Sequence, residues 1–416
     1  MDAVCTSRIG VAILNYDVVI VGAGVAGLTA ACALAQQTSL AIAVLEAKPL
    51  HCAWNAADYH HRVSALALSS KRILQQLKVW QEIAARRVSP FSHIAVWDAA
   101  AAGELQFDSA DIGESELGYI VENNLIQQAL LHRLENFPQV RVMTSCQLSE
   151  FKSYEDKIEI TTNFGIVTGK LAIAADGAQS WLRGKAGINM SEQEYGHDAI
   201  VTAVRTTKQH AQTARQVFLP TGPLAFLPLL ETNLSSIVWS VPPEMASELL
   251  ALTDEEFKTR LSAAFSCRLG DVVEVAKRFS FPLKRQRAQR YIAARVALIG
   301  DAAHTLHPLA GQGLNIGLLD AASIAEIIVD NVKQSRDVAH FASLRRYERW
   351  RKGENQLMLG GVDWLASLFG SDKKSVQTLR AFGCNVTNQF PLLRNFFIRF
   401  AVGSRSGLPD LAKDEI

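Results

Sequence analysis

The chain has 416 residues, of which 49% are hydrophobic, and its 42 basic and 41 acidic residues leave a net charge of +1. Its length exceeds the roughly 250 to 300 residues at which one hydrophobic core stops growing, so we expect two domains. The balanced charge argues against a nucleic-acid-binding protein, because such proteins usually carry a basic excess.

The cysteines are scattered and form no C-x-x-C pair, so the sequence indicates neither a metal site nor a disulfide framework. A reducing cytoplasm fits this usage best. The N-terminal residues lack the pattern of a cleaved signal peptide, and no run of 18 or more apolar residues predicts a membrane span.

Residues 16 to 46 predict a strand, a glycine-rich turn, a helix and a second strand that ends in an acid. Gly22, Gly24 and Gly27 have the G-x-G-x-x-G spacing, and Glu46 follows the second apolar run. In this context the pattern favours a dinucleotide site over an ordinary glycine turn, because the glycines let backbone amides approach a pyrophosphate. The pattern does not distinguish NAD from FAD, although Glu46 would repel the 2'-phosphate of NADP.

The next segments alternate between strand and helix patterns. Residues 62–80 predict a short strand or turn and an amphipathic helix, 91–107 predict strands, and 118–125 lead into a helix that runs to about residue 136. Further strands are expected at 140–143 and 158–162. Arg62 is a candidate contact for cofactor phosphate or flavin, with a solvated or capping arginine as the equal alternative.

Two apolar runs each end in an acid next to a glycine. Residues 171–175 lead into Asp176-Gly177, with Arg183 downstream, and residues 296–299 lead into Gly300-Asp301. An Asp-Gly turn is the ordinary interpretation of the first. Because the arrangement occurs twice, we favour two sheet edges that bring polar groups to one cofactor.

A loop with Pro308, Gly311 and Gly313 then opens a helix that includes Leu314 and Asn315. The first backbone amides of a helix lack intrahelical partners, and the N-terminal end of the helix dipole attracts negative charge. We therefore expect this helix start to face an anionic group.

Between residues 196 and 283 the pattern changes to short alternating runs separated by Gly and Pro, which predicts an antiparallel sheet in a second domain. Phe218, Phe226 and Trp239 are candidates for an aromatic substrate pocket, with ordinary sheet core as the alternative. The chain after residue 320 is helical. Residues 392–405 combine apolar and basic side chains, which fits either a helix at a lipid interface or packing on the protein itself.

In their order and separation, the glycine pattern, Asp176-Gly177 and Gly300-Asp301 resemble the single-component flavin-dependent aromatic hydroxylases of the para-hydroxybenzoate hydroxylase fold. The run His-Pro-Leu-Ala-Gly-Gln-Gly-Leu-Asn from His307 looks like the ubiquinone-biosynthesis hydroxylases, as do the segments 121–124, 225–229 and 236–240. Within these hydroxylases, the segments 215–218, 236–240 and 345–349 resemble the 2-polyprenylphenol hydroxylase branch. An N-terminal extension of residues 1–15, and Ala23-Gly24-Val25 where many relatives have Gly-Gly-Met, depart from the family.

The resemblance implies an α/β architecture, in which a Rossmann-like FAD-binding domain joins a mixed or antiparallel β-sheet substrate domain and C-terminal helices. The FAD-binding domain would comprise residues 16–90, 108–183 and 284–345. The substrate domain would comprise 91–107 and 184–283, and the C-terminal helical region 346–416.

The resemblance also implies FAD in an extended form. The residues expected to bind it are Gly22, Gly24 and Gly27 at the pyrophosphate, Glu46 at the ribose, Arg62 at the flavin side, Gly300 and Asp301 at the ribityl chain, Gly311, Gly313, Leu314 and Asn315 at the flavin ring, and Glu122. Asp176 and Arg183 would serve both FAD and the nicotinamide donor.

The implied reaction is hydroxylation of a polyprenylated phenol in ubiquinone biosynthesis, with NAD(P)H as electron donor and O2 as oxygen source. Because the cofactor performs the oxygen chemistry, no protein nucleophile is required. His304 and His307 are candidates for a general base, with a structural role as the alternative. Expected partners are other ubiquinone-biosynthesis proteins, with peripheral contact at the inner membrane through the C-terminal helix.

Two other functions remain open at this point. A flavin reductase or halogenase would keep the fold and change the chemistry, although the Trp-x-Trp-x-Ile-Pro pattern associated with halogenases is absent. A non-enzymatic FAD-bearing scaffold of a biosynthetic complex would use the apolar and basic C-terminal helix for docking.

Overall fold

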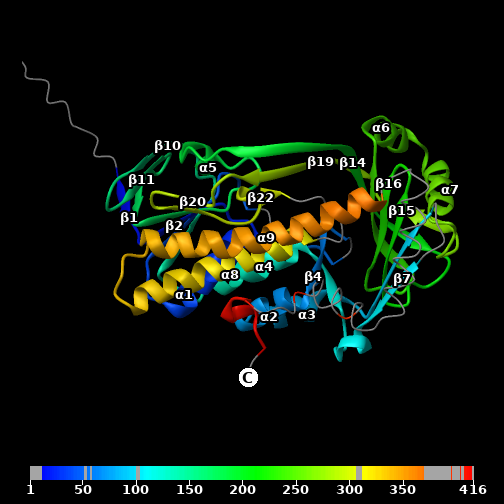
Figure 1. The fold of residues 1–416 in the computed structure, drawn as a ribbon, viewed down its shortest axis with the longest axis horizontal. Coiled ribbons are helices and arrows are strands. Elements are labelled where there is room, and N and C mark those ends of the chain that lie inside the picture. The colour runs from blue at the N-terminus through cyan, green and yellow to red at the C-terminus, as the bar shows by residue number, and fades with distance from the viewer. Residues whose placement is uncertain are drawn as a thin grey trace, which may run out of the picture.

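The computed structural model describes residues 12–50, 54–56, 59–99, 104–305, 312–369, 395, 403 and 407–414. Its elements form an elongated molecule with a nucleotide-binding half at one end and a second large sheet at the other (Figure 1). His307 and Gly311 lie outside the described residues, as do residues 392–405 except 395 and 403, so the predicted C-terminal helix stays a prediction.

A six-stranded sheet in the order β20-β21-β13-β2-β3-β9 forms the centre of the nucleotide-binding half. Its strands are β2 (Val18–Val21), β3 (Ile42–Leu45), β9 (Val140–Met143), β13 (Leu171–Ala174), β20 (Ile292–Ala293) and β21 (Val296–Leu298). All neighbours are parallel except β20 and β21. Because a parallel sheet is covered on both faces, its strands are apolar throughout. Every residue of β2 and β3 is at most 3% exposed.

Helices and a smaller sheet cover these strands. Helix α1 (Val25–Gln37) packs between α4 (Asn123–Leu134) and α8 (Gln312–Lys333). The smaller sheet contacts β2 through β12, and its strands in sheet order are β1 (Ile13–Asn15), β12 (Gly165–Gly169), β11 (Ile158–Thr162) and β10 (Leu148–Ser153). The strands expected at 140–143 and 158–162 are confirmed as β9 and β11.

The second large sheet has the order β22-β19-β14-β17-β16-β15-β6-β7, with β18 paired to β14. Its strands are β6 (His93–Asp98), β7 (Glu104–Asp108), β14 (Met190–Thr206), β15 (Thr213–Leu219), β16 (Gly222–Pro228), β17 (Leu234–Val241), β18 (Val272–Val275), β19 (Phe279–Ala288) and β22 (His304–Thr305). The pair β15–β6 is parallel and the other pairs are antiparallel.

The long strands β14 and β19 run from the nucleotide-binding half into the second sheet (Figure 1). The domain boundary expected between residues 283 and 284 therefore falls inside β19. The sequence could not place this boundary, because the paired strands β14 and β19 continue from one half into the other without a linker.

Two helices that the alternating pattern did not predict lie on one face of the second sheet. They are α6 (Pro243–Ala251) and α7 (Asp254–Ala264), and α7 begins with a capping box between Thr253 and Glu256. Together with alternate residues of the strands, they form a second hydrophobic core. The sheet is thus covered on one face by the protein itself.

Shorter elements connect the two halves. A small sheet consists, in sheet order, of β4 (Val63–Ala67), β8 (Gly118–Glu122) and β5 (Ser89–Phe91). Helices α2 (Leu68–Gln76) and α3 (Trp80–Arg86) lie between β4 and β5 in the chain. The 3-10 turn η1 (Ser109–Ile112) precedes β8. Together these segments place residues 59–67 between the nucleotide-binding sheet and the second sheet.

Helix α9 (Phe341–Phe369) packs along α8 and reaches toward the second sheet (Figure 1). The turn η4 (Asp410–Ala412) near the C-terminus returns to α2 and α8. Within the described part of the chain, no helix combines the length and the apolar content needed to span a membrane.

Candidate functional site

The glycine-rich turn after β2 is shaped by three different steric requirements. Gly22 has φ +105°, and a Cβ there would collide with the carbonyl oxygen of Ala175. A Cβ on Gly27 would collide with the carbonyl oxygen of Gly22. Gly24 is exposed, and a Cβ on it would meet nothing within 4 Å. Gly22 and Gly27 thus permit the turn itself, whereas Gly24 leaves open space for a ligand.

Two side chains from other elements hold this turn. The backbone amide of Ala23 donates to Glu46 Oε2 at 2.9 Å, and Gln127 Nε2 of α4 donates to the carbonyl oxygen of Ala23 at 2.7 Å. Glu46 was predicted to bind a ribose, and its contact with Ala23 places it directly beside the turn. Gln127 was missed, because nothing in the local sequence shows that α4 packs here.

The start of α1 lies at the same turn. Its N-cap residue is Gly24, and no side chain caps the helix. The first amides of a helix without a capping side chain can bind an anion, since they lack partners and carry partial positive charge. The open space at Gly24 and the uncapped helix start together fit a pyrophosphate.

Asp176 follows β13 and contacts the start of a short helix, α5 (Trp181–Lys185), whose N-cap residue is Ser180. Its carboxylate accepts hydrogen bonds from the Ser180 hydroxyl and, at 3.1 Å, from the Leu182 amide. Burial raises the pKa of Asp176, and these hydrogen bonds act in the opposite direction. The structure therefore shows Asp176 holding the N-cap residue and the first turn of α5 beside the glycine turn.

Arg183 links the two acid-containing motifs. Its guanidinium is buried and donates to the carbonyl oxygen of Ala302 at 3.0 Å and to that of Ala178 at 2.9 Å. Both predicted roles of Arg183 concerned a bound cofactor. In the structure, Arg183 also joins the turn after Asp176 to the turn at Gly300 through these two hydrogen bonds.

The turn after β21 forms η2 (Gly300–Ala302), close to the start of α1. Gly300 has φ +57°, and a Cβ there would lie 3.2 Å from Ala26 Cβ. Gly317 of α8 also lies against this turn, because a Cβ on it would be 3.4 Å from Gly300 Cα. Gly317 was not predicted, and it allows α8 to approach this turn.

Asp301 projects from this turn and is exposed to solvent. Dense protein surroundings raise the pKa of its carboxyl, whereas the nearby charges of His304 and Arg62 lower it. The effect of Arg62 on Asp301 shows that these two predicted residues, far apart in the sequence, lie in one electrostatic neighbourhood. An exposed carboxylate here is available to a ligand.

Asn315 near the start of α8 holds the junction between β4 and α2. Its Oδ1 accepts from the Ala67 amide at 2.9 Å and from the Ser70 hydroxyl at 2.7 Å, and its Nδ2 donates to the Ala65 carbonyl at 2.8 Å. The Asn315 side chain therefore fixes the segment after Arg62. Gly313 and Leu314 belong to the same first turn of α8.

Arg62 lies at the boundary between the two large sheets. Its guanidinium carbon is 5.4 Å from the ring centre of Phe281 in β19, and the neighbouring His61 stacks on Phe279 with ring centres 4.4 Å apart. Burial lowers the pKa of His61, as do its neighbours His60 and Arg62. This segment joins the predicted cofactor residues to one face of the second sheet.

Glu122 is 2% exposed and already has protein partners. Its carboxylate accepts from Trp54 Nε1 at 2.9 Å, from the His60 amide at 2.7 Å and from Arg87 Nε at 2.9 Å. These contacts hold the segment that precedes Arg62. In the structure, Glu122 therefore orients the segment that carries Arg62.

His304 is 1% exposed, and its Nε2 lies 2.5 Å from the buried carboxylate of Asp320. A general base for a substrate must reach the substrate, whereas this imidazole is enclosed by protein. The geometry fits the structural alternative that the sequence left open for His304. His307 lies outside the described residues.

The register of the second sheet separates its two faces. Phe226 and Trp239 are each 1% exposed and pack with α6 and α7 in the second core. Of the three aromatic residues predicted for the substrate pocket, these two therefore lie in ordinary core, for the reason that strand neighbours alternate between faces. Phe218 is directed to the opposite face, since its neighbour Val217 belongs to the core.

The opposite face carries a row of partly exposed residues, which we call the inner row. It runs across five strands through directly paired positions, from Phe279 to Val201, Val238, Ala225 and Gln216. All five are only half-buried. Because His61 stacks on Phe279, the inner row faces the cofactor residues. This apolar row ending in an amide is a candidate substrate surface.

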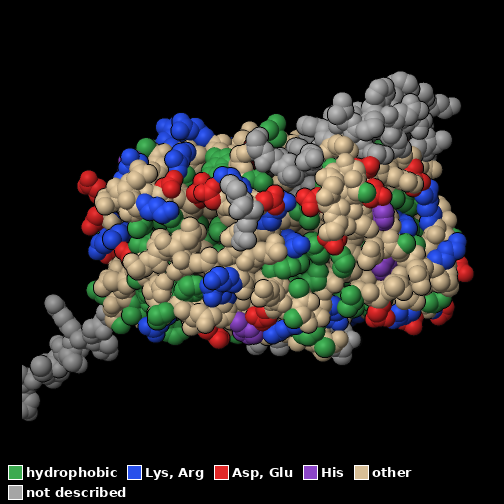
Figure 2. Space-filling model, turned by 90° about the horizontal axis from the view of Figure 1, so that it is seen from below, with side chains coloured by type: hydrophobic (Ala, Val, Ile, Leu, Met, Phe, Trp, Pro, Cys, Tyr) green, Lys and Arg blue, Asp and Glu red, His purple; other side chains and the backbone are tan. Residues whose placement is uncertain are grey.

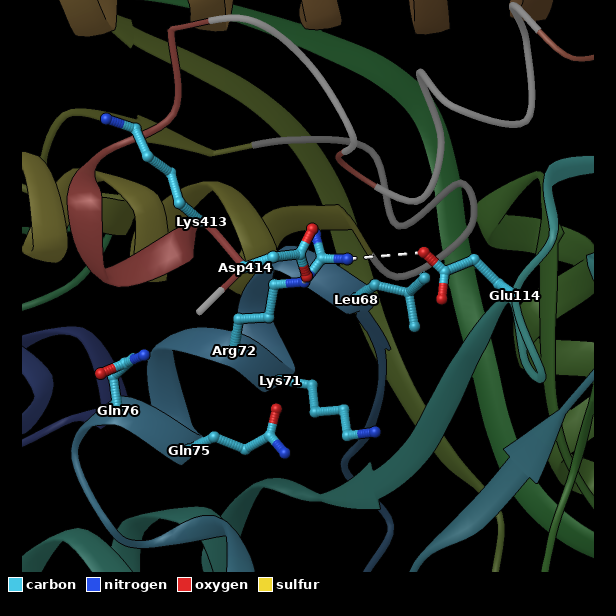
Figure 3. Close-up of a pocket in the computed structure, with 8 residues that line it drawn as sticks. All are labelled: Leu68, Lys71, Arg72, Gln75, Gln76, Glu114, Lys413 and Asp414. Carbon is cyan, nitrogen blue, oxygen red and sulfur yellow. Dashed lines mark hydrogen bonds and ion pairs between the residues drawn. The ribbon is translucent and has the colours of Figure 1, made fainter. Parts of the chain in front are cut away.

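A surface cavity of about 290 Å³ lies elsewhere, between α2, Glu114 and the C-terminal residues (Figure 3). Arg72 is at its centre, with Nε 2.6 Å from Asp414 and Nη2 3.5 Å from Glu114. Its central cation is already paired, and none of the predicted cofactor residues lines it. We therefore do not assign the cofactor to this cavity.

On the face of the molecule shown in Figure 2, acidic and basic side chains are interspersed with apolar ones. That face carries no broad field of a single sign. The chemistry of the candidate site therefore depends on the local groups described above.

Comparison with known proteins agrees with this geometry. Residues 15–358 match the FAD binding domain family. The ubiquinone hydroxylase UbiL of Rhodospirillum rubrum is 37% identical over 389 residues, which cover 93% of this chain and 90% of that protein. The 3-demethoxyubiquinol 3-hydroxylase of Escherichia coli is 32% identical over 390 residues, which cover 93% of this chain and 98% of that protein.

The fold is similar to that of a solved aromatic monooxygenase. The p-nitrophenol 4-monooxygenase PnpA from Pseudomonas putida superposes with a TM-score of 0.76 over 94% of this chain and 99% of that chain, at 19% identity. The similarity therefore extends through both large sheets.

Proposed function

The chain belongs to the FAD binding domain family, together with the ubiquinone-biosynthesis hydroxylases, and we propose that it hydroxylates the aromatic ring of a polyprenylated phenol with NAD(P)H and O2. The cofactor of this flavoprotein is FAD. The observation that carries the proposal is the close approach of two turns: a Cβ on Gly300, the residue before the exposed Asp301, would lie 3.2 Å from the Cβ of Ala26 in the first turn of α1. The charge of Arg62 acts on Asp301, and the neighbouring His61 stacks on Phe279 of the inner row.

The residues present fit FAD. Gly24 and the uncapped start of α1 would hold the pyrophosphate, and Glu46 at the same turn would accept hydrogen bonds from the ribose. Asp301 would bind the ribityl chain. The first turn of α8 would direct its partial positive charge toward the flavin ring, an effect worth up to about 2 kcal/mol for a partly buried anion.

When bound, FAD supplies the electron transfer from NAD(P)H and the activation of O2. The protein must then place the phenol ring and keep water away from it. The inner row suits an apolar aromatic ring, and Gln216 at its end offers an amide to a hydroxyl group. The half-buried Phe279 and Phe281, which contact His61 and Arg62, would cover the ring from the domain boundary.

Profiling of quinone intermediates by mass spectrometry tests this function in a strain that lacks the protein. We expect an accumulated prenylated phenol or quinol that is one ring oxygen short of the next intermediate. The native gene should restore the profile, whereas a Gly24→Val variant, which should not bind FAD, should leave the intermediate in place. An unchanged quinone profile in the deletion strain would contradict the proposal.

Oxygen incorporation identifies the reaction in the purified holoenzyme. With 18O2, the accumulated intermediate and NAD(P)H, we expect one labelled oxygen on the ring. Reduction of the intermediate without label would instead identify a reductase of the same fold.

A further inference from the structure

A buried polar cluster lies directly behind the Gly300–Asp301 turn, and its central residue is Asp320 of α8. Asp320 is fully buried. Its Oδ2 accepts from the Gly300 amide at 3.1 Å and lies 2.5 Å from His304 Nε2. Its Oδ1 accepts from Arg351 Nε at 2.8 Å and from Asn355 Nδ2 at 3.2 Å. One carboxylate therefore joins the cofactor turn to helix α9.

Asp320 is held in its ionised form. Burial alone would raise the pKa of this carboxyl, but the charges of His304 and Arg351 and the hydrogen bonds from them lower it to about 2. Ion pairs of this kind are often no more stabilising than apolar residues of similar volume, because both charges lose their water. Stability alone is therefore a weak reason for this cluster.

The geometry offers a stronger reason. Gly300 has φ +57°, its amide donates to Asp320, and the next residue, Asp301, is exposed. The same turn is tied to α9 a second time, since Tyr347 donates from its hydroxyl to the Leu298 carbonyl at 2.7 Å. The end of β21, the Gly300–Asp301 turn and α9 are thus held together, and Asp301 is the exposed residue of this unit.

We propose that Asp320 is a positioning residue for the cofactor, and that its carboxylate, held by Arg351 and Asn355, keeps the Gly300–Asp301 turn in the geometry that binds FAD. The inference rests on the proposed contact between Asp301 and FAD. It also couples α9 to the flavin site, because two of the four groups bound to this carboxylate belong to that helix.

The test compares two Asp→Asn variants on the same helix. Asp320→Asn removes the charge of the cluster, whereas Asp330→Asn removes a surface ion pair between α8 and α9, in which Arg346 Nη2 lies 2.7 Å from Asp330. The dissociation constant of FAD is measured by quenching of flavin fluorescence on the apoprotein, and the visible absorption spectrum is recorded at saturating FAD.

For Asp320→Asn we expect FAD affinity to fall about tenfold or more, as for loss of a hydrogen bond to a charged group. The absorption spectrum of the bound flavin should shift, and Asp330→Asn should match the native protein in both measurements. Native affinity and a native spectrum in Asp320→Asn would overturn the proposal.

Asn355→Leu keeps the test decisive if Asp320→Asn does not fold. This variant removes one donor to Asp320 Oδ1 and the acceptor of Arg351 Nη2, but Arg351 Nε stays paired with Asp320. It should therefore fold and bind FAD about threefold more weakly. Unchanged FAD affinity in Asn355→Leu would overturn the proposal in that case.

Asp301→Ala separates the inference from the proposed function. If Asp301→Ala binds FAD as tightly as the native protein, the contact between Asp301 and the cofactor is wrong. If Asp301→Ala loses affinity while Asp320→Asn does not, only the positioning role of Asp320 fails.

Discussion

At the scale of single residues, the three glycines of one motif have different physical roles. A side chain at Gly22 or Gly27 would collide with backbone carbonyl groups of the protein itself, whereas a side chain at Gly24 would enter open space. The same sequence pattern therefore contains two glycines that the turn itself requires and one, Gly24, that we propose is required for binding.

Gly24→Val should abolish FAD binding and leave the apoprotein folded. The added methyl groups occupy the space proposed for the pyrophosphate, so we expect the FAD dissociation constant to rise about 100-fold or more. Isothermal titration with FAD measures the change, and circular dichroism of the apoprotein checks the fold. Gly22→Val is the matched control, and it should lower the melting temperature of the apoprotein because of its φ and its contact with Ala175. Equal FAD affinity in Gly24→Val and the native protein would contradict this assignment.

The side chains of two other predicted residues have protein partners. Glu122 orients the segment before Arg62, and Asn315 fixes the segment after it. Sequence reasoning placed both at the cofactor. Their side chains have protein partners in the structure, and this could not be seen from sequence because those partners come from distant segments.

At the scale of elements, the two faces of the second large sheet differ: one packs in the second core and the other carries the inner row. Val238 and Trp239 are adjacent in β17, yet Val238 belongs to the inner row and Trp239 packs against α7 through Phe257, with ring centres 6.4 Å apart. Successive strand residues point to opposite faces, so a one-residue difference separates a candidate substrate surface from the core.

Substitutions on the two faces should therefore have different effects. Trp239→Leu leaves a cavity in the core, and we expect a loss of about 3 kcal/mol in the free energy of unfolding with an unchanged KM for the phenol. Ala225→Phe fills the inner row, and it should raise that KM about tenfold or more with a small change in stability. Urea unfolding and steady-state kinetics measure both quantities. A raised KM in Trp239→Leu together with a native KM in Ala225→Phe would reverse the assignment of the faces.

At the scale of the whole molecule, β14, β19 and α9 join the two halves. The long strands pass through both, and α9 is tied to the cofactor turn through Asp320 and the Leu298 carbonyl. Because Asp320 links these elements, we expect its protonation to lower the free energy of unfolding of the whole molecule at low pH.

Asp320 gives the unfolding free energy a defined dependence on pH. Its pKa in the folded protein is about 2, below its ordinary value of 3.8, so its contribution to stability is complete above about pH 4 and is lost as the pH falls toward 2. The expected contribution is about 2 kcal/mol. Urea unfolding between pH 5 and pH 2.5 should show a shallower loss in Asp320→Asn, since that variant has no carboxyl to protonate. Parallel pH curves for the two proteins would contradict the low pKa.

Several features followed from the sequence alone, because their physical requirement is local. The glycine spacing, the apolar runs of β2, β3, β13 and β21 and the acids that follow the last three strands are each read within a few residues, since the requirement concerns backbone conformation and burial. Parallel pairing then brings the ends of β2, β13 and β21 to one sheet edge, which is why the three motifs meet.

Only the tertiary structure decided which groups support that edge. Gln127, Gly317 and Asp320 approach the cofactor turns from helices α4 and α8, and Ala23, the partner of Gln127, lies 104 residues away in the chain. The face of Phe226 and Trp239 was also undecided, because an alternating pattern shows that two faces exist but not which one α6 and α7 cover. Local sequence determines conformation and burial, whereas the partner of a buried polar group or a sheet face is set by packing between distant segments.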